Sequence, residues 1–498
     1  MLMHQAKVAS SSVEWMTGLT QCDNPRHGRG LILAAPASGS GKTLVTAGLL
    51  RLMREHGIRV AAAKAGPDYI DPTFHAAASG GVSINLDPWA MRPATLAGLV
   101  GLLEAGADIV LCEGLMGLFD GTGRDGEEGS TAALARLTGW PVVLVVDASR
   151  QGASAAALVG GFARHDPGLA LAGVIFNRVA GPRHRALLER AMARHLPDIA
   201  CLGAVPRCPE LILPERHLGL VPAGERADAE TVIAQAAQAV AAGIAVEQLV
   251  ALAHPASLTL PRIAPSLTLP RLRGREGWGR GREGLGPEAG EGAPLPPLGM
   301  RIAIARDDAF VFLYPAVLEG WRRAGAELAF FSPLADEMPD PASDAVYLPG
   351  GYPELHAGRL AAAAHFQAAL RRAASAGTAI YGECGGYMAL GESLVDGDGR
   401  AHPMAGLLPL RTSFAEPRLH LGYRALTLLG AGPLGPPGAR FRGHEFHYAT
   451  TLAPDAHTGA AASLFALADS EGCDLGASGL RQGSVMGSFI HLIDRAED

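Results

Sequence analysis

The feature that most limits how this chain can fold is a repeated pattern of short apolar runs, each followed by a helix-length segment. From residue 31 the runs are bounded by turns, and polar residues do not alternate with apolar ones inside them. Unalternated runs are typical of strands buried on both faces, as in a parallel sheet covered by helices. We therefore predict a doubly wound α/β domain over residues 29–248. Its predicted strands are 31–35, 60–63, 109–112, 142–146 and 173–176.

The same pattern returns in the second half of the chain. It predicts a second doubly wound α/β domain over residues 300–493. Its predicted strands are 302–305, 328–331, 345–348 and 379–381, and its predicted helices are 313–325 and 358–376.

Two segments do not follow this pattern. Residues 1–28 are polar and aperiodic, which predicts a disordered lead-in. Residues 249–299 contain the string Ser-Leu-Thr-Leu-Pro-Arg twice, starting at Ser257 and at Ser266, and are rich in Pro, Gly and Arg. Such a stretch buries too little apolar surface to offset the entropy of ordering it, so we predict a low-complexity linker between the two domains.

The composition argues against several classes of function. The 498 residues carry a net charge of -7, which gives no general basis for binding nucleic acid or anionic lipid. The chain has no apolar run of about 18 residues, and its start lacks the apolar stretch of a signal peptide. Six scattered cysteines favour a reducing compartment. We expect a cytoplasmic protein with small-molecule partners, acting either as a monomer or as a homodimer, and without nucleic acid or membrane partners.

A phosphate-binding loop follows the first predicted strand. Pro36-Ala-Ser-Gly-Ser-Gly-Lys-Thr precedes an apolar helix pattern that begins at Leu44, and strand, loop and helix in this order are the context that such a loop requires. Backbone N–H groups would hold the β-phosphate of a nucleotide, Lys42 would reach the β- and γ-phosphates, and Thr43 would ligate Mg²⁺. Pro36 stands where the pattern has its first Gly. The candidate nucleotide-binding residues here are Ser38, Gly39, Ser40, Gly41, Lys42 and Thr43.

Four acids and a lysine lie near the ends of the next predicted strands. The segments 64–72 and 113–121 follow the second and third predicted strands, and their turns should meet the phosphate loop at the carboxyl edge of the sheet. Any single Asp in such turns is also a common turn-former or helix cap. Lysine is scarce, with three in the whole chain, so its placement here favours a site. The candidates are Asp68 and Glu113 for Mg²⁺, Lys64 for phosphate charge, and Asp71 and Asp120 for a second substrate.

A candidate nucleophile lies at a sharp turn in the second half. The string Ala379-Ile-Tyr-Gly-Glu-Cys-Gly-Gly-Tyr-Met predicts a strand, a bend at Cys384 and a helix. The helix N-terminus would favour a thiolate there, and Gly385 would let a substrate approach. Gly351, after the strand 345–348, would supply an oxyanion-hole N–H. The alternative is a buried, inert cysteine.

Three histidines are candidates for the base that activates Cys384, namely His444, His447 and His491. The run Arg442-Gly-His-Glu-Phe-His-Tyr also has the look of a metal site. Because His444 and His447 have no further ligand set, we favour structural or ligand-facing roles over zinc.

Several strings carry a resemblance to a known family. The strings are Gly66-Pro-Asp-Tyr-Ile-Asp-Pro, Asn85-Leu-Asp, Glu113-Gly-Leu-Met-Gly-Leu-Phe-Asp-Gly, Gly129-Ser-Thr-Ala and Leu213-Pro-Glu-Arg-His-Leu-Gly-Leu. With these strings the chain resembles the cobyrinate (or hydrogenobyrinate) a,c-diamide synthase family of cobalamin biosynthesis over roughly residues 30–245 and 300–493. The first half is similar in plan to dethiobiotin synthetase, which implies that Thr43, Asp68 and Glu113 bind Mg²⁺ and that Asn177 reads adenine.

The second half resembles class I glutamine amidotransferases. In those enzymes the base lies in a C-terminal segment such as Ser488-Phe-Ile-His-Leu, and this selects His491. Many of them have Glu two residues after the His, where this chain has Ile493. The family named above is similar in lacking that Glu, which implies a Cys–His pair and leaves a full triad open.

Together the resemblances imply an ATP- and glutamine-dependent amidation. ATP with Mg²⁺ would phosphorylate a substrate carboxylate, and Cys384 would release ammonia from L-glutamine to displace the phosphate. The acceptors would be the a- and c-acetate groups of cobyrinate or hydrogenobyrinate. The expected partners are thus ATP, L-glutamine and a corrinoid, with Mg²⁺ as the cofactor.

Three alternatives stand beside this hypothesis. A cobyric acid synthase shares the domain order and chemistry but lacks the paired strings that contain Asp68 and Glu113. A partner-regulated partitioning ATPase carries an extra Lys early in its phosphate loop, where this chain has Ala37, and has no amidotransferase half. The third is a binding module in which Cys384 is inert.

Overall fold

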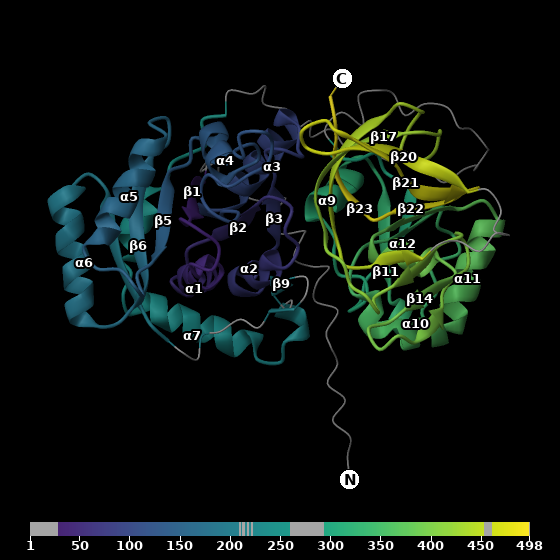
Figure 1. Cartoon of the computed structure of the whole chain (residues 1–498), viewed down its shortest axis with the longest axis horizontal. Helices are drawn as coiled ribbons and strands as arrows, with labels where there is room; N and C mark the ends of the chain where they lie inside the picture. Colours follow the sequence, from purple (N-terminus) through teal and green to yellow (C-terminus); the bar gives the residue numbers. More distant parts are fainter. Residues whose placement is uncertain are drawn as a thin grey trace, which may run out of the picture.

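The computed structural model describes residues 28–208, 211, 215–216, 219–220, 223–258, 293–452 and 461–497. Two α/β domains lie side by side, the N-terminal one drawn in purple to teal and the C-terminal one in green to yellow (Figure 1). The predicted lead-in 1–28, except for Gly28, lies outside the described residues.

The N-terminal domain is built on a seven-stranded sheet with the order β3-β2-β4-β1-β5-β6-β7. All neighbouring pairs in it are parallel. The strands are β1 Arg29–Ala34, β2 Val60–Ala65, β3 Ser83–Leu86, β4 Ile109–Glu113, β5 Val142–Asp147, β6 Leu171–Val179 and β7 Ala200–Pro206. The helices are α1 Lys42–Glu55, α2 Asp71–Ser79, α3 Pro93–Gly106, α4 Thr131–Thr138, α5 Ser154–His165, α6 Pro182–His195, α7 Ala229–Ala241 and α8 Val246–Leu252.

The burial of β1 shows why its sequence lacks alternation. Leu31 and Leu33 belong to one apolar cluster, and Ile32 belongs to another on the opposite face of the sheet. Helices cover both faces, so each residue of the strand needs an apolar side chain. The doubly wound parallel sheet predicted from the sequence is confirmed, with β3 and β7 as additional strands.

The ends of the predicted linker 249–299 belong to the packed structure. Helix α8 continues into it as far as Leu252, and His254 bridges to Gly30 of β1. At the other end Leu295 and Leu298 are buried. The rest of the predicted linker, residues 259–292, lies outside the described residues.

The C-terminal domain is built on a ten-stranded mixed sheet with the order β11-β10-β12-β13-β22-β21-β20-β17-β18-β23. Its strands are β10 Arg301–Ala305, β11 Glu327–Phe331, β12 Ala345–Leu348, β13 Ala379–Glu383, β17 His420–Leu428, β18 Arg440–His447, β20 Ala462–Ala468, β21 Asp474–Gln482, β22 Val485–Ser488 and β23 Ile490–Arg495. A four-stranded sheet contains β14 Ser393–Val395, β15 Ala401–Pro403, β16 Arg411–Ser413 and β19 Thr450–Leu452. The helices are α9 Pro315–Arg323, α10 Ala357–Ala362, α11 Ala364–Ser375 and α12 Gly385–Leu390.

This second sheet differs from the sequence prediction beyond its parallel part. Strands β10 to β13 and β22 are parallel, whereas the strands from β21 to β23 in the sheet order pair antiparallel. The predicted helix 358–376 is two helices, α10 and α11, which are separated at Ala363. Thus the doubly wound pattern holds for the first strands, and an antiparallel extension follows them.

Strand β23 contains an irregularity that bears on the site. Its pairing with β18 places Leu492 opposite Gly443 and Asp494 opposite Arg442, so Ile493 is an extra residue in a β-bulge. A bulge changes the direction of the side chains that follow it. Asp494 can therefore turn toward the other domain.

Buried polar contacts join the two domains. The Tyr314 hydroxyl donates to the Pro67 carbonyl at 2.9 Å, and Arg92 forms a 2.9 Å ion pair with Asp494. The Tyr423 hydroxyl donates to Asp87 Oδ2 at 2.9 Å. Because buried polar groups are costly when their partners are removed, these contacts favour one arrangement of the domains.

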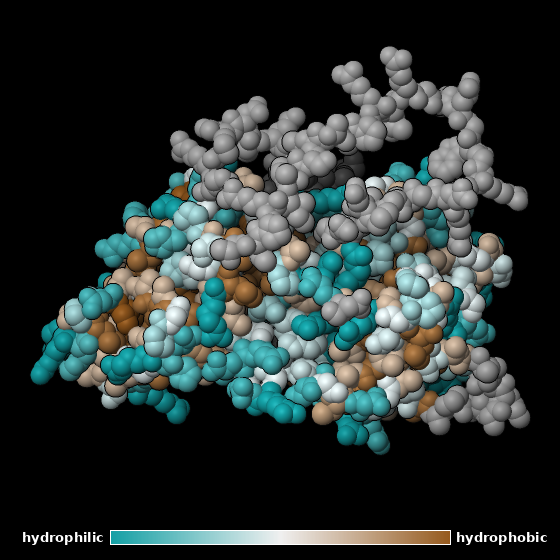
Figure 2. All heavy atoms as spheres, turned by 90° about the horizontal axis from the view of Figure 1, so that it is seen from above, coloured by the Kyte–Doolittle hydropathy of each residue, from teal (hydrophilic) through white to brown (hydrophobic). Residues whose placement is uncertain are grey.

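The described surface carries both polar and apolar side chains. Figure 2 shows hydrophilic side chains interspersed with smaller hydrophobic groups on the face that it presents. Among the described residues, every helix is too short or too polar to cross a bilayer.

Candidate active sites

The predicted phosphate loop lies between β1 and α1. Helix α1 begins at Lys42, and Gly41 before it has a φ of 86°. Gly39 has a φ of 77°, so both positions adopt a left-handed conformation that favours glycine. Ser38 and Gly39 are exposed, while Ser40 is buried and donates its hydroxyl to the Ala37 carbonyl at 2.8 Å. The loop thus presents backbone next to a helix N-terminus, an arrangement suited to phosphate.

Two side chains at the start of α1 contact the loop after β4. Lys42 Nζ donates to the Met116 carbonyl at 2.5 Å, and the Thr43 hydroxyl donates to Glu113 Oε1 at 2.9 Å. Burial lowers the pKa of Lys42. The carboxyl edge of the sheet therefore brings the loop and Glu113 together, as the strand order predicts.

A buried ion cluster surrounds Glu113. Lys64 Nζ lies 2.5 Å from Asp71 Oδ2 and 2.9 Å from Glu113 Oε1, and His75 Nε2 lies 2.6 Å from Glu113 Oε2. Burial alone would raise the pKa of Glu113, but the charges of Lys64 and His75 outweigh it and lower the pKa. Burial alone would lower the pKa of Lys64, but Asp71 and Glu113 raise it above its ordinary value. The cluster thus holds an ammonium and a carboxylate in their charged forms beside the phosphate loop.

His75 is a member of this cluster that the sequence analysis missed. It lies on α2, four residues after Asp71, and its side chain is fully buried. Its position one helical turn after Asp71 is the signal that sequence reasoning had available.

Asp68 and Asp120 are placed differently. Asp68 Oδ1 accepts the Ile70 N–H at 2.7 Å, and Asp120 Oδ2 accepts the Gly117 N–H at 2.9 Å. These are the contacts of turn-forming acids. Asp68 is half-buried and Asp120 is exposed, so each retains oxygen atoms that a ligand can reach.

Asn177 lies near the end of β6 and contacts the phosphate loop. Its Nδ2 donates to the Ser40 carbonyl at 2.9 Å. A cavity of about 50 Å³ opens beside it. The cavity is lined by residues of α1, β6, β7 and α7, including Gly41, Val45, Asn177, Arg178, Pro206 and Val240.

Cys384 lies at a strained bend between β13 and α12. Its φ is 46°, a rare conformation for a residue with a side chain, and its N–H donates to the Ser488 carbonyl at 2.8 Å. A Cβ on Gly385 would lie 3.0 Å from the Gly351 nitrogen, so the backbone of these two glycines meets at the bend. This is the geometry of a nucleophile elbow with N–H groups nearby.

Burial works against the predicted preference of Cys384 for the thiolate form. Cys384 is buried, and burial, followed by the charge of Glu354, raises the pKa of its thiol. A base is therefore needed to take the thiol proton.

His491 lies on β23 directly opposite His444 of β18. A Cβ on Gly350 would lie 2.3 Å from His491 Cε1, so the imidazole packs against the loop that carries Gly351. Burial, together with the charges of His444 and His447, lowers the pKa of His491 to about 3. The imidazole is therefore neutral and able to accept a proton.

The structure groups a different set of residues into a possible zinc site from the His444 and His447 considered in the sequence analysis. Within the described ranges, the grouping with metal-ligand spacing is His420, Glu445 and His447. The rings of His420 and His447 are stacked at 4.6 Å with an angle of 8°. Because the nitrogen lone pairs lie in the ring planes, parallel stacked rings do not point at one ion. Arg424 also forms a 2.7 Å ion pair with Glu445, which favours a structural cluster.

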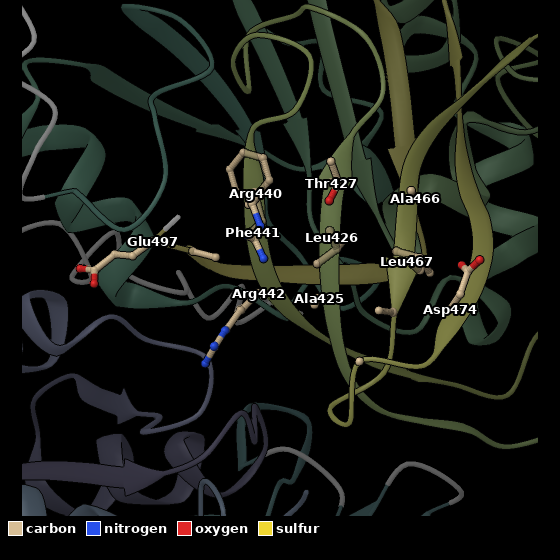
Figure 3. Close-up of a pocket in the computed structure, with 13 residues that line it drawn as sticks. Ala425, Leu426, Thr427, Arg440, Phe441, Arg442, Ala466, Leu467, Asp474 and Glu497 are labelled. Atoms are coloured by element: carbon tan, nitrogen blue, oxygen red, sulfur yellow. The ribbon is translucent and has the colours of Figure 1, made fainter.

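A larger cavity of about 320 Å³ lies on the C-terminal sheet. Figure 3 shows its lining residues on neighbouring strands, with Arg442 directed toward the N-terminal domain. Arg442 donates to the Trp89 carbonyl and its guanidinium lies over the Trp89 ring. Cys384 is not among the lining residues, so this cavity is separate from the elbow.

The fold and these two sites define a class of protein, a P-loop nucleotide-binding domain joined to a glutamine amidotransferase domain. Residues 31–221 match the CobQ/CobB/MinD/ParA nucleotide binding domain, and residues 301–498 match the CobB/CobQ-like glutamine amidotransferase domain. The chain is accordingly a glutamine-hydrolysing ligase that uses ATP.

Similarity to curated relatives covers nearly the whole chain. A hydrogenobyrinate a,c-diamide synthase of Brucella anthropi is 50% identical over 94% of this chain and 98% of its own length. The synthase of Rhodobacter capsulatus is 51% identical over 93% of this chain and 98% of its own length. That of Rhizobium meliloti is 48% identical over 94% of this chain and 100% of its own length. This chain belongs to the hydrogenobyrinate a,c-diamide synthase family. Among solved structures, PurLQS from Thermotoga maritima aligns with 40% of this chain and 88% of its own chain at 18% identity. Its TM-score is 0.27, which is too low to support a structural comparison.

Proposed function

We propose that this enzyme amidates the a- and c-acetate carboxylates of hydrogenobyrinate, or of its cobalt form cobyrinate, in cobalamin biosynthesis. The observation that carries this proposal is the identity of about half of all residues to synthases of that name across both domains. The match includes the amidotransferase half, which a partitioning ATPase lacks.

The N-terminal domain is proposed to activate the substrate carboxylate. Ammonia does not displace oxide from a carboxylate, so transfer of the γ-phosphoryl group from ATP to a carboxylate oxygen first creates a leaving group. Lys42 and Lys64 would stabilise the phosphate charge, and the N–H groups of loop residues 38–43 would hold the β-phosphate. Asn177 would contact adenine from the wall of its cavity.

Thr43, Asp68 and Glu113 would hold Mg²⁺. The 2.9 Å contact of the Thr43 hydroxyl with Glu113 Oε1 places two oxygen donors together at the phosphate loop, a donor type that Mg²⁺ prefers. When bound, the ion supplies neutralisation of phosphate charge. Asp71 and Asp120 are proposed to face the corrinoid.

The C-terminal domain is proposed to release ammonia from L-glutamine. Cys384 would attack the side-chain amide, with its thiol proton passing to His491, while N–H groups of Gly351 and Gly385 hold the oxyanion. The C–N bond then breaks, ammonia leaves with a proton from His491, and water hydrolyses the glutamyl thioester. Ammonia attacks the acyl phosphate in the other domain, and the products are the amide, glutamate, ADP and phosphate.

Two substitutions test this division of labour. Cys384→Ser should abolish glutamine-driven amidation and retain ammonia-driven amidation, whereas Lys42→Ala should lose both. The measurement is mass spectrometry of the corrinoid product made with ATP and ¹⁵N-amide glutamine. Label on carboxylates other than a and c would favour a cobyric acid synthase, and glutamine use by Cys384→Ser would contradict the role of the second domain.

The cellular setting is part of the same proposal. We propose a cytoplasmic enzyme, and light scattering of the purified chain would decide between a monomer and a homodimer.

A further inference from the structure

Glu383 is a buried acid directly before Cys384. Its Oε2 accepts the Tyr347 hydroxyl at 2.7 Å, and its Oε1 accepts the Leu492 N–H at 3.1 Å. Both donors are neutral, and burial raises the pKa of Glu383 to about 7. A carboxyl group in such a place costs free energy when it ionises, so its presence in the core calls for a partner that gains charge.

The partner is the imidazole of His491. Its Nδ1 lies 3.9 Å from Glu383 Oε2. Within the residues that the structure describes, this Nδ1 is buried and has no hydrogen-bond partner. Catalytic hydrogen bonds are often long before substrate binds and shorten in the complex. A small rotation of either side chain would therefore shorten the 3.9 Å between Nδ1 and the carboxylate to a hydrogen-bond distance.

Residue 493 cannot supply this carboxylate. Ile493, two residues after His491, is 2% exposed and is the extra residue of the bulge in β23. Its side chain is apolar. Glu383 approaches the same imidazole from a different element, the end of β13.

We propose that Glu383 is the positioning residue of His491, so that the site is a Cys384–His491–Glu383 triad whose acid precedes the nucleophile in the chain. The carboxylate would accept Nδ1–H, which directs Nε2 to take the thiol proton. The thiolate then bonds to the amide carbon, and the carbonyl π electrons move to oxygen. On collapse of the intermediate, the C–N bond breaks and the imidazolium returns its proton to the leaving ammonia. This inference rests on the proposed roles of Cys384 and His491.

Burial, the largest of the effects that lower the pKa of His491, makes this support necessary because it disfavours an imidazolium there. Among the neighbours, His444 and His447 disfavour the imidazolium and Glu445 favours it. Burial also lowers the pKa of His444 to about 4, so that imidazole is neutral over the pH range of the assay. Besides His491, the titratable groups around Glu383 are Tyr69, Tyr314, Tyr347, Tyr381 and Cys384, and burial raises the pKa of each, so all five are neutral at ordinary pH. Because the pKa of Glu383 is raised to about 7, its carboxylate form appears as the pH rises through that value. Glutaminase kcat/KM should therefore fall on the acid side of about pH 7.

The test is glutaminase kinetics of Glu383→Gln from pH 5.5 to 9, with the full-length enzyme, ATP and corrinoid. We expect kcat to fall on the order of 10²-fold with little change in the KM for glutamine, and the acid limb near pH 7 to disappear. Alkylation of Cys384 by iodoacetamide at pH 8 should slow in parallel. A structural role alone would not remove the acid limb. A Glu383→Gln enzyme with the wild-type kcat and acid limb would overturn the proposal.

Ammonia-driven amidation by Glu383→Gln reports whether this variant folds. If that activity is lost, Tyr347→Phe is the second variant, since the Tyr347 hydroxyl lowers the pKa of Glu383. Its loss should move the acid limb to higher pH, and an unmoved limb contradicts the proposal. The variant His491→Ala separates the two hypotheses. If His491→Ala retains glutaminase activity, His491 is not the base. If His491→Ala is inactive while Glu383→Gln is fully active, only the proposed role of Glu383 is contradicted.

Discussion

The ring of Tyr69, from the N-terminal domain, lies 5.0 Å from the imidazole of His491, from the C-terminal domain. Tyr69 also stacks on Phe312 at 5.0 Å and on Tyr314 at 4.3 Å. It follows Asp68, a proposed Mg²⁺ ligand, in the loop between β2 and α2, and its ring lies against the proposed base of the glutaminase site.

Removing this ring should weaken the connection between the two activities. We expect Tyr69→Ala to lower glutamine-driven amidation about tenfold more than ammonia-driven amidation, because His491 loses the nearer of its two aromatic neighbours, Tyr69 and Phe312. Tyr69→Phe keeps the ring and is the control, with near wild-type rates expected. Paired assays with glutamine and with ammonium chloride measure the difference, and an equal loss in both would count against the link.

The space beside His491 should tolerate no side chain. A Cβ at Gly350 would lie 2.3 Å from His491 Cε1, so Gly350→Ala should displace the imidazole and lower glutaminase kcat by about 10²-fold while ammonia-driven amidation persists. Gly397 has nothing within 4 Å of a built Cβ, so Gly397→Ala is the matched control. Wild-type glutaminase in Gly350→Ala would show that the imidazole moves without loss.

The buried ion cluster should matter more for stability than an exposed ion pair of similar length. Lys64→Met leaves Asp71 and Glu113 without their ammonium partner and should lower the free energy of unfolding by about 3–5 kcal/mol. The Arg59–Asp108 pair, at 2.6 Å, has half-exposed side chains, and Arg59→Ala should cost at most about 1 kcal/mol. Thermal unfolding of both variants makes the comparison, and equal shifts in Tm would contradict it.

The contact between Tyr423 and Asp87 should make domain docking depend on pH. Burial raises the pKa of Asp87 to about 6, so the stability associated with its neutral form is present below the unfolded pKa of about 4 and is lost as the pH rises through 6. The Tyr423 hydroxyl lowers that pKa by stabilising the carboxylate. Tyr423→Phe should therefore cost about 1–3 kcal/mol at pH 7.5 and less at pH 5. Thermal unfolding at both pH values tests this, and a larger loss at pH 5 would reverse the sign.

Much of the site geometry was predictable because its signals are local. The phosphate loop, Lys42, Thr43 and Glu113 stand at strand ends whose apolar runs mark a parallel sheet, and parallel strands bring their carboxyl ends to one edge. The elbow at Cys384 was predictable for the same reason. Strand β3 was missed because it has four residues, two of them polar, and it offers no apolar run.

The remaining features depend on contacts between distant parts of the chain. No spacing rule relates Tyr69 to His491, since their contact exists only once the domains dock. The position of Ile493 argued for a pair without an acid, but spacing after the histidine says nothing about Glu383, whose Oε2 lies 3.9 Å from the imidazole Nδ1 on another strand. The raised pKa of Cys384 likewise follows from burial and from Glu354, which the sequence alone does not place beside it.

Strand β23 has six residues and carries two functions, the proposed catalytic base and a contact with the other domain, and the bulge at Ile493 lies between them. His491 stands before it, and Asp494, the partner of Arg92 across the domains, stands after it. Deleting that one spacer would turn every later side chain to the opposite face, so the ion pair would break even though no side chain in it had changed. The number of residues between His491 and Asp494 is therefore as much a part of the design of this strand as the two side chains themselves.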